Sequence, residues 1–246
     1  MLIKILKYFL YPILNIIKRI RIMIYKHTSI DFYKEYLEKD TSAYKLYKKE
    51  QELNNYNYFK KFFRSSIFLN KKEIRKFAIE KAITNDLNND KYYLEFGVFN
   101  GTSINFFADL LKNKIYGFDS FKGLNENWEH NLKGAYDSSG KEPKVKKNVS
   151  LVKGLVQNTV PKFLSDKKPS INFVHMDLDT YESTKFVLRE IKPYLVKKSI
   201  IIFDQIYNHT GWEKGELKAL TEVFEENEYK YLSFAKDGCQ AVLEIS

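Results

Sequence analysis

Two glycines four residues apart stand where an apolar run gives way to a helical pattern. The segment reads Glu95-x-Gly97-x-x-x-Gly101, and Thr102 and Ser103 then open the helical stretch. Glycine lets the backbone turn sharply and lets a ligand approach the main chain closely. The N-terminus of the following helix offers N–H groups to a carboxylate or a phosphate. The segment therefore predicts a ligand site built mainly from backbone.

An acid ends the next apolar run. Asp119 closes the run Lys114–Asp119, at about the 20-residue distance from the glycines where ribose-binding acids typically fall. Its carboxylate is well placed there to accept hydrogen bonds from two ribose hydroxyls. A dinucleotide fingerprint would read G-x-G-x-x-G, but position 99 is Phe, so NAD binding is disfavoured. The alternative role for Asp119 is to cap a helix.

Two later apolar runs also end in acids. The fourth run ends at Asp177, shortly before Asp179, and the fifth ends at Asp204. Ligands of open α/β sheets bind beyond the carboxyl ends of the strands, near the switch in strand order. Asp177 and Asp204 should therefore face the same crevice as Gly97. Two convergent carboxylates could hold a hard divalent cation that orients a substrate hydroxyl. Asp179 fits the N-cap of the next helix.

Two histidines lie near these acids. His209 follows the fifth run in a loop and is a candidate general base, although a lone loop histidine is more often merely exposed. His175 lies inside an apolar run, which favours a buried structural role.

A sheet is needed to position these residues. Seven short apolar runs, most of them separated by helix-length segments, predict a doubly wound α/β sheet with mostly parallel strands. The last two runs lack room for a crossover helix, so they should form an antiparallel hairpin. The runs are Tyr92–Gly97, Lys114–Asp119, Val149–Lys153, Ile171–Asp177, Ser199–Asp204, Tyr229–Phe234 and Gln240–Ile245.

The sequence pattern divides the chain into three parts. Residues 1–30 are a basic amphipathic segment, and residues 31–90 lack Gly and Pro and are predicted to form helices. Residues 91–246 carry the alternating strand and helix pattern. Within them, residues 123–148 are predicted to be a long loop, and loops of that length are usually functional, often as lids.

The composition limits the kinds of partner and the cellular compartment that we expect for this chain. The formal net charge is +10, but lysine supplies nearly all of it and the chain has only five arginines. Scarce arginine argues against a nucleic-acid reading surface, because arginine makes the bidentate phosphate and guanine contacts. The single cysteine, Cys239, makes no internal disulfide and no cysteine-rich metal site, which favours a reducing cytoplasm.

Residues 2–25 alternate apolar clusters with basic residues. The longest uncharged stretch, Tyr8 to Ile17, falls far short of the ~20 residues that a spanning helix needs, and no small-residue cleavage site follows it. On a helical wheel the basic and apolar residues separate, as in a helix at an anionic membrane interface. We therefore expect a cytoplasmic protein, and peripheral contact at the inner face of the membrane is one of two interpretations of this segment. The alternative is a helix, kinked or split at Pro12, that packs on the domain or on a second subunit of a homo-oligomer.

Several longer runs carry a family resemblance. They are EFGVFNGTSINFFA (95–108), GFDSFKGL (117–124), DLDTYEST (177–184), FDQ (203–205) and GWE (211–213). In this order they resemble class I S-adenosylmethionine-dependent methyltransferases of the macrocin O-methyltransferase-like family. The resemblance covers roughly residues 72–245. It implies a Rossmann-like fold with a seven-stranded sheet, which makes residues 91–246 an S-adenosylmethionine-binding domain.

The resemblance assigns roles to individual positions. The glutamate and the two glycines of the first motif would line the methionine end of the cofactor, Asp119 would lie at the ribose, and Gln157 would lie near the adenine. The expected cofactor-binding residues are Glu95, Gly97, Gly101, Thr102, Ser103, Asp119, Ser120, Gln157 and Asp177.

Characterised members of that family methylate hydroxyls, often on sugars, with a magnesium ion at the acids after strands four and five. Those positions are Asp177, Asp204 and Gln205 here. Gln205 departs from the family pattern of Asp or Glu, and its uncharged oxygen should lower metal affinity. Asp177 and His209 are the expected catalytic residues. The implied function is O-methylation of a glycan or a small hydroxylated metabolite. The alternatives are a methyltransferase with a nitrogen or lipid acceptor, and a cofactor-binding module that no longer catalyses.

Overall fold

The computed structural model describes residues 43–128 and 131–246. Contacts divide the chain into two units, residues 1–50 and residues 51–246. The second unit carries the whole sheet and the site described below. The basic amphipathic segment expected at residues 2–25 lies outside the described residues. None of the helices in the described ranges has the length and hydropathy needed to cross a bilayer.

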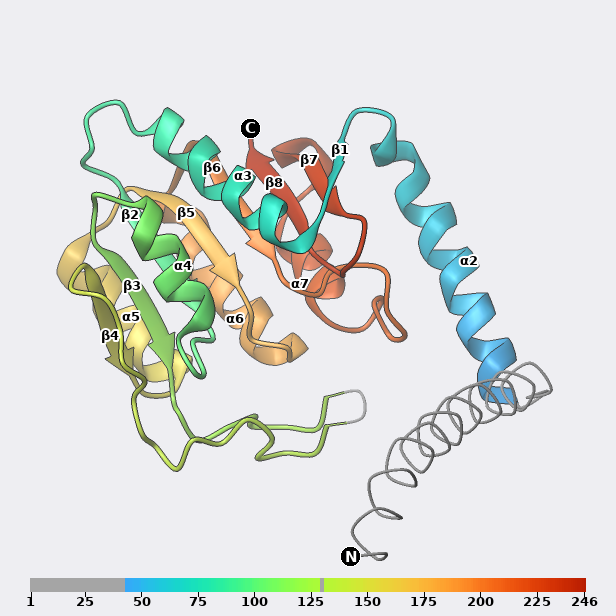
Figure 1. The fold of residues 1–246 in the computed structure, drawn as a ribbon, viewed down its shortest axis with the longest axis horizontal. Coiled ribbons are helices and arrows are strands. Elements are labelled where there is room, and N and C mark those ends of the chain that lie inside the picture. The colour runs from blue at the N-terminus through green and yellow to red at the C-terminus, as the bar shows by residue number, and fades with distance from the viewer. Residues whose placement is uncertain (1–42, 129–130) are drawn as a thin grey trace, which may run out of the picture. The chain divides into compact units, whose positions relative to one another are not determined.

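One sheet of eight strands forms the centre of the second unit (Figure 1). The strand order is β1-β7-β8-β6-β5-β2-β3-β4. Neighbouring strands are parallel except for β8, which is antiparallel to both β6 and β7. The strands are β1 (Ile67–Leu69), β2 (Tyr92–Phe96), β3 (Ile115–Asp119), β4 (Val149–Lys153), β5 (Ile171–Met176), β6 (Leu195–Phe203), β7 (Tyr229–Ala235) and β8 (Ala241–Ile245).

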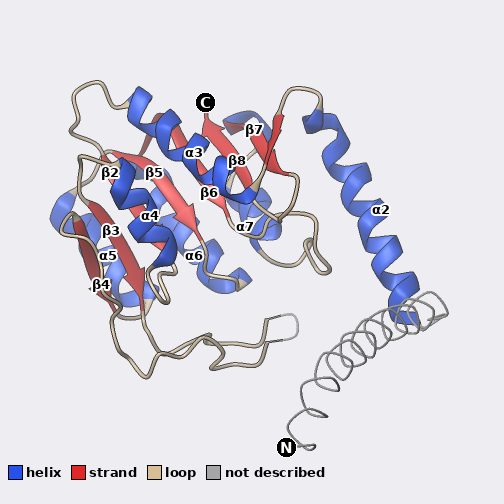
Figure 2. Ribbon diagram, in the orientation of Figure 1, coloured by secondary structure: helices blue, strands red, loops and turns tan. Residues whose placement is uncertain are grey.

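Helices cover both faces of this sheet (Figure 2). Successive strand residues point to opposite faces, and the core divides accordingly: Phe173 packs with α3 and α4, whereas Val174 packs with α5, α6 and α7. The end of α2 joins the second face through Phe59. The helices are α2 (Ala43–Phe63), α3 (Lys71–Asn85), α4 (Thr102–Leu110), α5 (Val156–Lys167), α6 (Tyr181–Ile191) and α7 (Glu216–Val223), with 3-10 turns at Lys192–Tyr194 and Glu226–Glu228.

All seven expected strands are present, and the antiparallel hairpin of β7 and β8 is confirmed. Strand ends agree to within one residue except in β6, which begins at Leu195 rather than Ser199. The sheet also has an unexpected edge strand, β1, which pairs parallel with β7. Its three residues are too few to show a period-two pattern. The region before residue 91 therefore contributes both a strand and the helix α3 to the same layered core.

The strand order switches between β2 and β5. From β2 the chain continues to β3 and β4 on one side, and β5 and β6 lie on the other side. The first and fourth expected strands are thus neighbours, with Glu95 opposite His175 and Phe96 opposite Met176. In open α/β sheets this switch point opens a crevice beyond the carboxyl ends of the strands.

Candidate functional site

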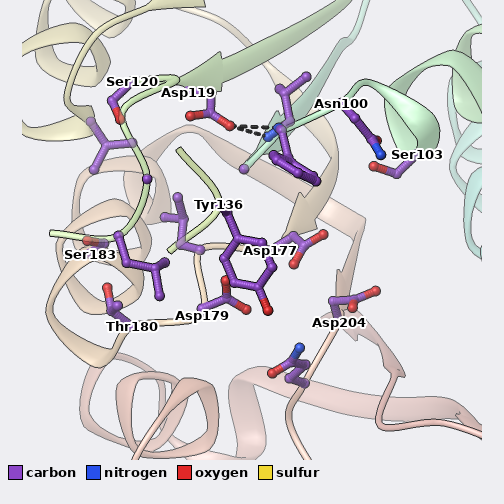
Figure 3. Close-up of a pocket in the computed structure, with 18 of the residues that line it drawn as sticks. Asn100, Ser103, Asp119, Ser120, Tyr136, Asp177, Asp179, Thr180, Ser183 and Asp204 are labelled. Carbon is purple, nitrogen blue, oxygen red and sulfur yellow. Dashed lines mark hydrogen bonds between the residues drawn. The ribbon is translucent and has the colours of Figure 1, made fainter. Parts of the chain in front are cut away.

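A cavity of about 320 Å³ opens at the carboxyl ends of β2, β3, β5 and β6 (Figure 3). Its lining comes from the turns that follow these strands, from the start of α3 and α6, and from the long loop after β3. One cavity therefore joins the glycine turn to acids from three strand ends. Of the residues expected at the site, it is lined by Gly97, Thr102, Ser103, Asp119, Ser120, Asp177, Asp204 and Gln205.

The turn after β2 requires glycine at position 97. Gly97 has φ +88°, and a Cβ atom added there would lie 1.7 Å from the Asp177 carbonyl oxygen. The Asp177 N–H also donates to the Phe96 carbonyl at 2.8 Å. The backbones after β2 and β5 thus pass in direct contact, which no side chain would permit. This contact places Asp177 at the glycine turn.

Asp119 at the end of β3 holds the glycine turn in place. Its Oδ2 accepts the N–H groups of Val98 and Phe99, each at 2.8 Å (Figure 3), and its Oδ1 accepts that of Phe121 at 2.7 Å. A carboxylate offers about four lone-pair positions, so these bonds leave little capacity for two ribose hydroxyls. The donors belong to turns, not to the first turn of a helix that Asp119 caps. Ribose binding by Asp119 stays a prediction.

The long loop after β3 borders the cavity. Leu124 bonds through its backbone to Gly134 and Ala135, which gives this loop a hairpin-like base. Tyr136 lines the cavity and packs edge-on against Phe99 of the glycine turn, with ring centroids 5.7 Å apart. The loop predicted at residues 123–148 therefore contributes to the site.

A buried polar chain runs beneath the cavity. Ser103 Oγ donates to Glu95 Oε1 at 2.9 Å, and Glu95 Oε2 lies 3.1 Å from His175 Nδ1. His175 Nε2 lies 3.7 Å from Asp204 Oδ1. Burial opposes a charge on the imidazole, but the Asp204 and Glu95 carboxylates outweigh it and raise the pKa of His175 to about 9. The histidine is therefore a buried cation between two acids at neutral pH.

Asp177, Asp204 and His175 offer ligand atoms that lie within 4.8 Å of one another. Burial raises the pKa of the Asp177 carboxyl well above its usual range, and the charge of Asp204 adds to this effect. Burial acts in the same direction on Asp204, but His175 and Arg75 outweigh it, and the pKa of Asp204 is lowered. The two acids therefore differ in proton affinity although they share one edge of the cavity.

Asp204 already has two strong donors. Arg75 Nη2 donates to Asp204 Oδ1 at 2.9 Å, and Gln240 Nε2 donates to the same oxygen. Its neighbour Gln205 donates its backbone N–H to Glu216 Oε2 at 2.9 Å. The expected metal ligands Asp204 and Gln205 are thus tied into the protein by bonds that the sequence did not indicate.

Three expected cofactor residues lie outside the cavity lining. Glu95 is fully buried below it and contacts Ser103 and His175 instead. Gly101 is the N-cap of α4, with a left-handed backbone at φ +79°. Gln157 lies in the first turn of α5, one residue beyond the lining residue Val156.

His209 also lies outside the lining. Its Nδ1 is 3.0 Å from the Thr210 carbonyl, and its Nε2 is 3.0 Å from the Gln205 carbonyl. A general base needs a ring nitrogen that faces the substrate proton. The loop carbonyls hold His209 away from that position, so Asp177 is the better placed of the two expected catalytic residues.

The cavity also has polar lining residues that the sequence did not single out: Lys71, Arg75, Asn100, Asn125, Tyr136, Thr180 and Ser183. The sequence did offer one indication for Arg75, since it is one of only five arginines in a chain rich in lysine. Its position on α3, about 130 residues before Asp204, could not be connected to the site without the fold.

Comparison with known families settles the class of this domain. Residues 94–206, which run from β2 past the acids of β5 and β6, match the sequence profile of a methyltransferase domain. The chain carries a class I S-adenosylmethionine-dependent methyltransferase domain. Among curated proteins, none matches the sequence.

Solved structures of O-methyltransferases share this fold. The calicheamicin methyltransferase CalS11 is 24% identical with a TM-score of 0.57, over 89% of this chain and 91% of CalS11. An apo structure of CalS11, described as a TDP-rhamnose 3'-O-methyltransferase, is 25% identical with a TM-score of 0.53. The match covers 89% of this chain and 93% of CalS11. The O-methyltransferase NovP is 18% identical with a TM-score of 0.52, covering 71% of this chain and 78% of NovP.

Proposed function

We propose that this protein transfers a methyl group from S-adenosylmethionine to a hydroxyl of a sugar, a glycan or a small hydroxylated metabolite. The observation that carries the proposal is the single cavity that joins the glycine turn at Gly97 to the carboxylate of Asp177. The description of CalS11 as a TDP-rhamnose 3'-O-methyltransferase supports a sugar hydroxyl as the acceptor.

The donor side of the cavity suits S-adenosylmethionine. The Thr102 N–H donates to Asn100 Oδ1 at 3.1 Å. The Ser103 N–H in the first turn of α4 lacks a partner within the helix, and such a group favours a carboxylate. Ser120 lies at the end of β3 and Val156 at the start of α5, where the ribose and adenine would lie. The bound cofactor supplies an electrophilic methyl group on a sulfonium centre.

Asp177 is the group that would accept the proton of the acceptor hydroxyl. The acceptor oxygen forms a bond to the methyl carbon while the carbon–sulfur bond breaks, and the hydroxyl proton passes to the Asp177 carboxylate. Burial raises the pKa of this carboxyl, which makes it a stronger base than an ordinary aspartate. Its contact with the glycine turn keeps it beside the donor.

The test is methyl transfer from labelled S-adenosylmethionine to a panel of hydroxylated acceptors that includes nucleotide-linked deoxysugars. Asp177→Asn should lower kcat by about 10²- to 10⁴-fold, the usual contribution of a positioned base, with cofactor affinity measured by calorimetry largely unchanged. Asp166→Asn, at an exposed position of α5, is the matched control and should keep full activity.

The outcomes separate the alternatives. A fully active Asp177→Asn variant would remove Asp177 from the proton transfer. Cofactor binding without turnover on any acceptor would indicate a module that no longer catalyses. Turnover confined to amines or lipids would replace the hydroxyl acceptor.

A further inference from the structure

Arg75 on α3 reaches the acidic edge of the cavity. The Arg75–Asp204 pair spans 2.9 Å, and its two side chains are only 16% and 10% exposed. Removing one partner of a buried ion pair leaves an uncompensated charge, which strongly destabilises the folded protein. Gln240 donates to the same carboxylate oxygen. Arg75 is therefore a fixed positive charge at the cavity wall.

A divalent cation does not fit the same edge. Magnesium prefers near-octahedral coordination by oxygen, usually with one or two carboxylates. Arg75 and Gln240 both donate to Asp204 Oδ1, and the positive charge of the guanidinium opposes a cation at the other oxygen of that carboxylate. The third expected ligand, Gln205, carries no charge. His175 offers nitrogen, which hard cations disfavour, and its Nδ1 faces Glu95. Asp177 is left as the acid that Arg75 does not engage.

Arg75 also has donors to spare. A guanidinium carries five N–H groups, and the bond to Asp204 uses one. Its Nε is buried without a hydrogen-bond partner among the described residues, so the protein leaves part of the donor capacity of this guanidinium unused. The Arg75 side chain lines the cavity on the same edge as Asp177 and Asp204. An acceptor oxygen at this edge would meet both a cationic donor and a carboxylate.

We propose that Arg75 takes the place of the divalent cation, so that methyl transfer by this protein needs no metal. This inference rests on the proposed function. Arg75 donates to the acceptor oxygen and stabilises its negative charge while the hydroxyl proton moves to Asp177. The oxygen–carbon bond forms, the carbon–sulfur bond breaks, and the guanidinium stays protonated throughout, so no further reactant is needed.

The first test measures metal binding and needs no substrate. Manganese, a spectroscopic substitute for magnesium, is titrated into the full-length protein with S-adenosylhomocysteine present and followed by electron paramagnetic resonance. The wild type should show no saturable site at millimolar manganese. The double variant Arg75→Ala/Gln205→Asp frees Asp204 and adds an acid, and it should bind manganese at least tenfold more tightly than the wild type.

The second test measures turnover. Chelator should leave wild-type kcat/KM unchanged, and Arg75→Ala should lower it by about 10²- to 10³-fold, as when one preorganised donor is removed. Millimolar guanidinium should partly restore the Arg75→Ala variant, which a purely structural role would not produce. Lys76→Ala is the matched control, because Lys76 follows Arg75 on α3 but pairs with Glu80 on the surface at 3.7 Å.

Three results would overturn the inference. They are saturable manganese binding to the wild type that Asp204→Asn abolishes, loss of wild-type turnover in chelator with recovery in magnesium, and a double variant that gains no manganese binding. The second result would leave the methyl-transfer function intact. Absence of any methyl transfer would instead refute the proposed function, and the wild-type manganese titration would still show whether this edge excludes a cation, even if the variants failed to fold.

Discussion

Glu95 connects two residues of the site from a fully buried position below the cavity. Its two carboxylate oxygens bond to Ser103, which lines the cavity, and to His175, which lies beside Asp204. In a buried network each polar group depends on its partners, because the low dielectric strengthens satisfied bonds and penalises unsatisfied ones. Glu95 therefore links Ser103 at the start of α4 to His175 beside Asp204.

The charge of His175 predicts a pH dependence of stability. Its pKa is raised from 6.5 to about 9 in the folded protein, so the folded state binds the proton more tightly than the unfolded state. This contribution is fully present below pH 6.5 and is lost as the pH rises through 9. The free energy of unfolding, measured with urea, should fall across this window.

His175→Gln is the comparison for that measurement. Its stability should be lower at pH 6.5 and should change less between pH 6.5 and 9. Equal slopes for the variant and the wild type would show that another group titrates.

Asp119 gives a prediction about the cofactor. Asp119→Ala removes the acceptor of three backbone N–H groups at the glycine turn and any bond to the ribose. Loss of a charged acceptor should weaken S-adenosylmethionine binding by about 1–3 kcal/mol, as calorimetry would measure. Unchanged affinity would take Asp119 out of the binding site.

At the scale of elements, α3 positions the basic side of the cavity. Asn70 caps its N-terminus: the side chain accepts the N–H groups of Lys72 and Glu73, and Glu73 bonds back to the Asn70 N–H. The apolar face of α3 packs on the sheet through residues such as Ile74 and Ala78. Cap and core together set the height of Arg75 above the strand ends.

Removal of this cap should affect stability more than chemistry. Asn70→Ala should lower the free energy of unfolding by about 1 kcal/mol, the usual value of an N-cap. Because core packing still fixes α3, kcat measured well below the melting temperature should change less than twofold. A large loss of kcat at full folding would mean that the cap itself controls Arg75.

At the scale of the whole molecule, the N-terminal segment is the part that sequence alone describes. In one of the two interpretations left open, residues 2–25 bind an anionic membrane surface, where each basic residue contributes about 1 kcal/mol. The full chain should co-sediment with vesicles that contain phosphatidylserine. A full-length variant with Lys4, Lys7, Lys18 and Arg19 changed to Glu should not. Neutral phosphatidylcholine vesicles are the control.

Equal sedimentation of the two proteins would favour the alternative, in which the segment packs on protein. Sedimentation velocity of the same pair would then show whether the partner is a second subunit. A cytoplasmic location remains a prediction from the cysteine content.

The fold could be predicted from the sequence because apolar runs, turn glycines and strand-end acids are local features of the chain. Apolar runs such as those of β5 and β6 are continuous and bounded by polar turns. Glycine is required where two backbones touch at the strand ends, as at Gly97. The acid at the end of β3 follows from the same one-dimensional pattern. The short strand β1 was not predicted, because three residues are too few to show an alternating apolar pattern.

The pairing of charged side chains could not be predicted from the sequence, because it depends on contacts between residues far apart in the chain. The sequence indicated Asp204 as a metal ligand but did not show that α3 brings Arg75 to within 2.9 Å of it. The family resemblance assigned Glu95 to the cofactor but did not show that the pairing of β2 with β5 turns its carboxylate toward His175. Residue type and strand position follow from local sequence, whereas the partner of a buried charge is set by the packing of the complete sheet and its helices.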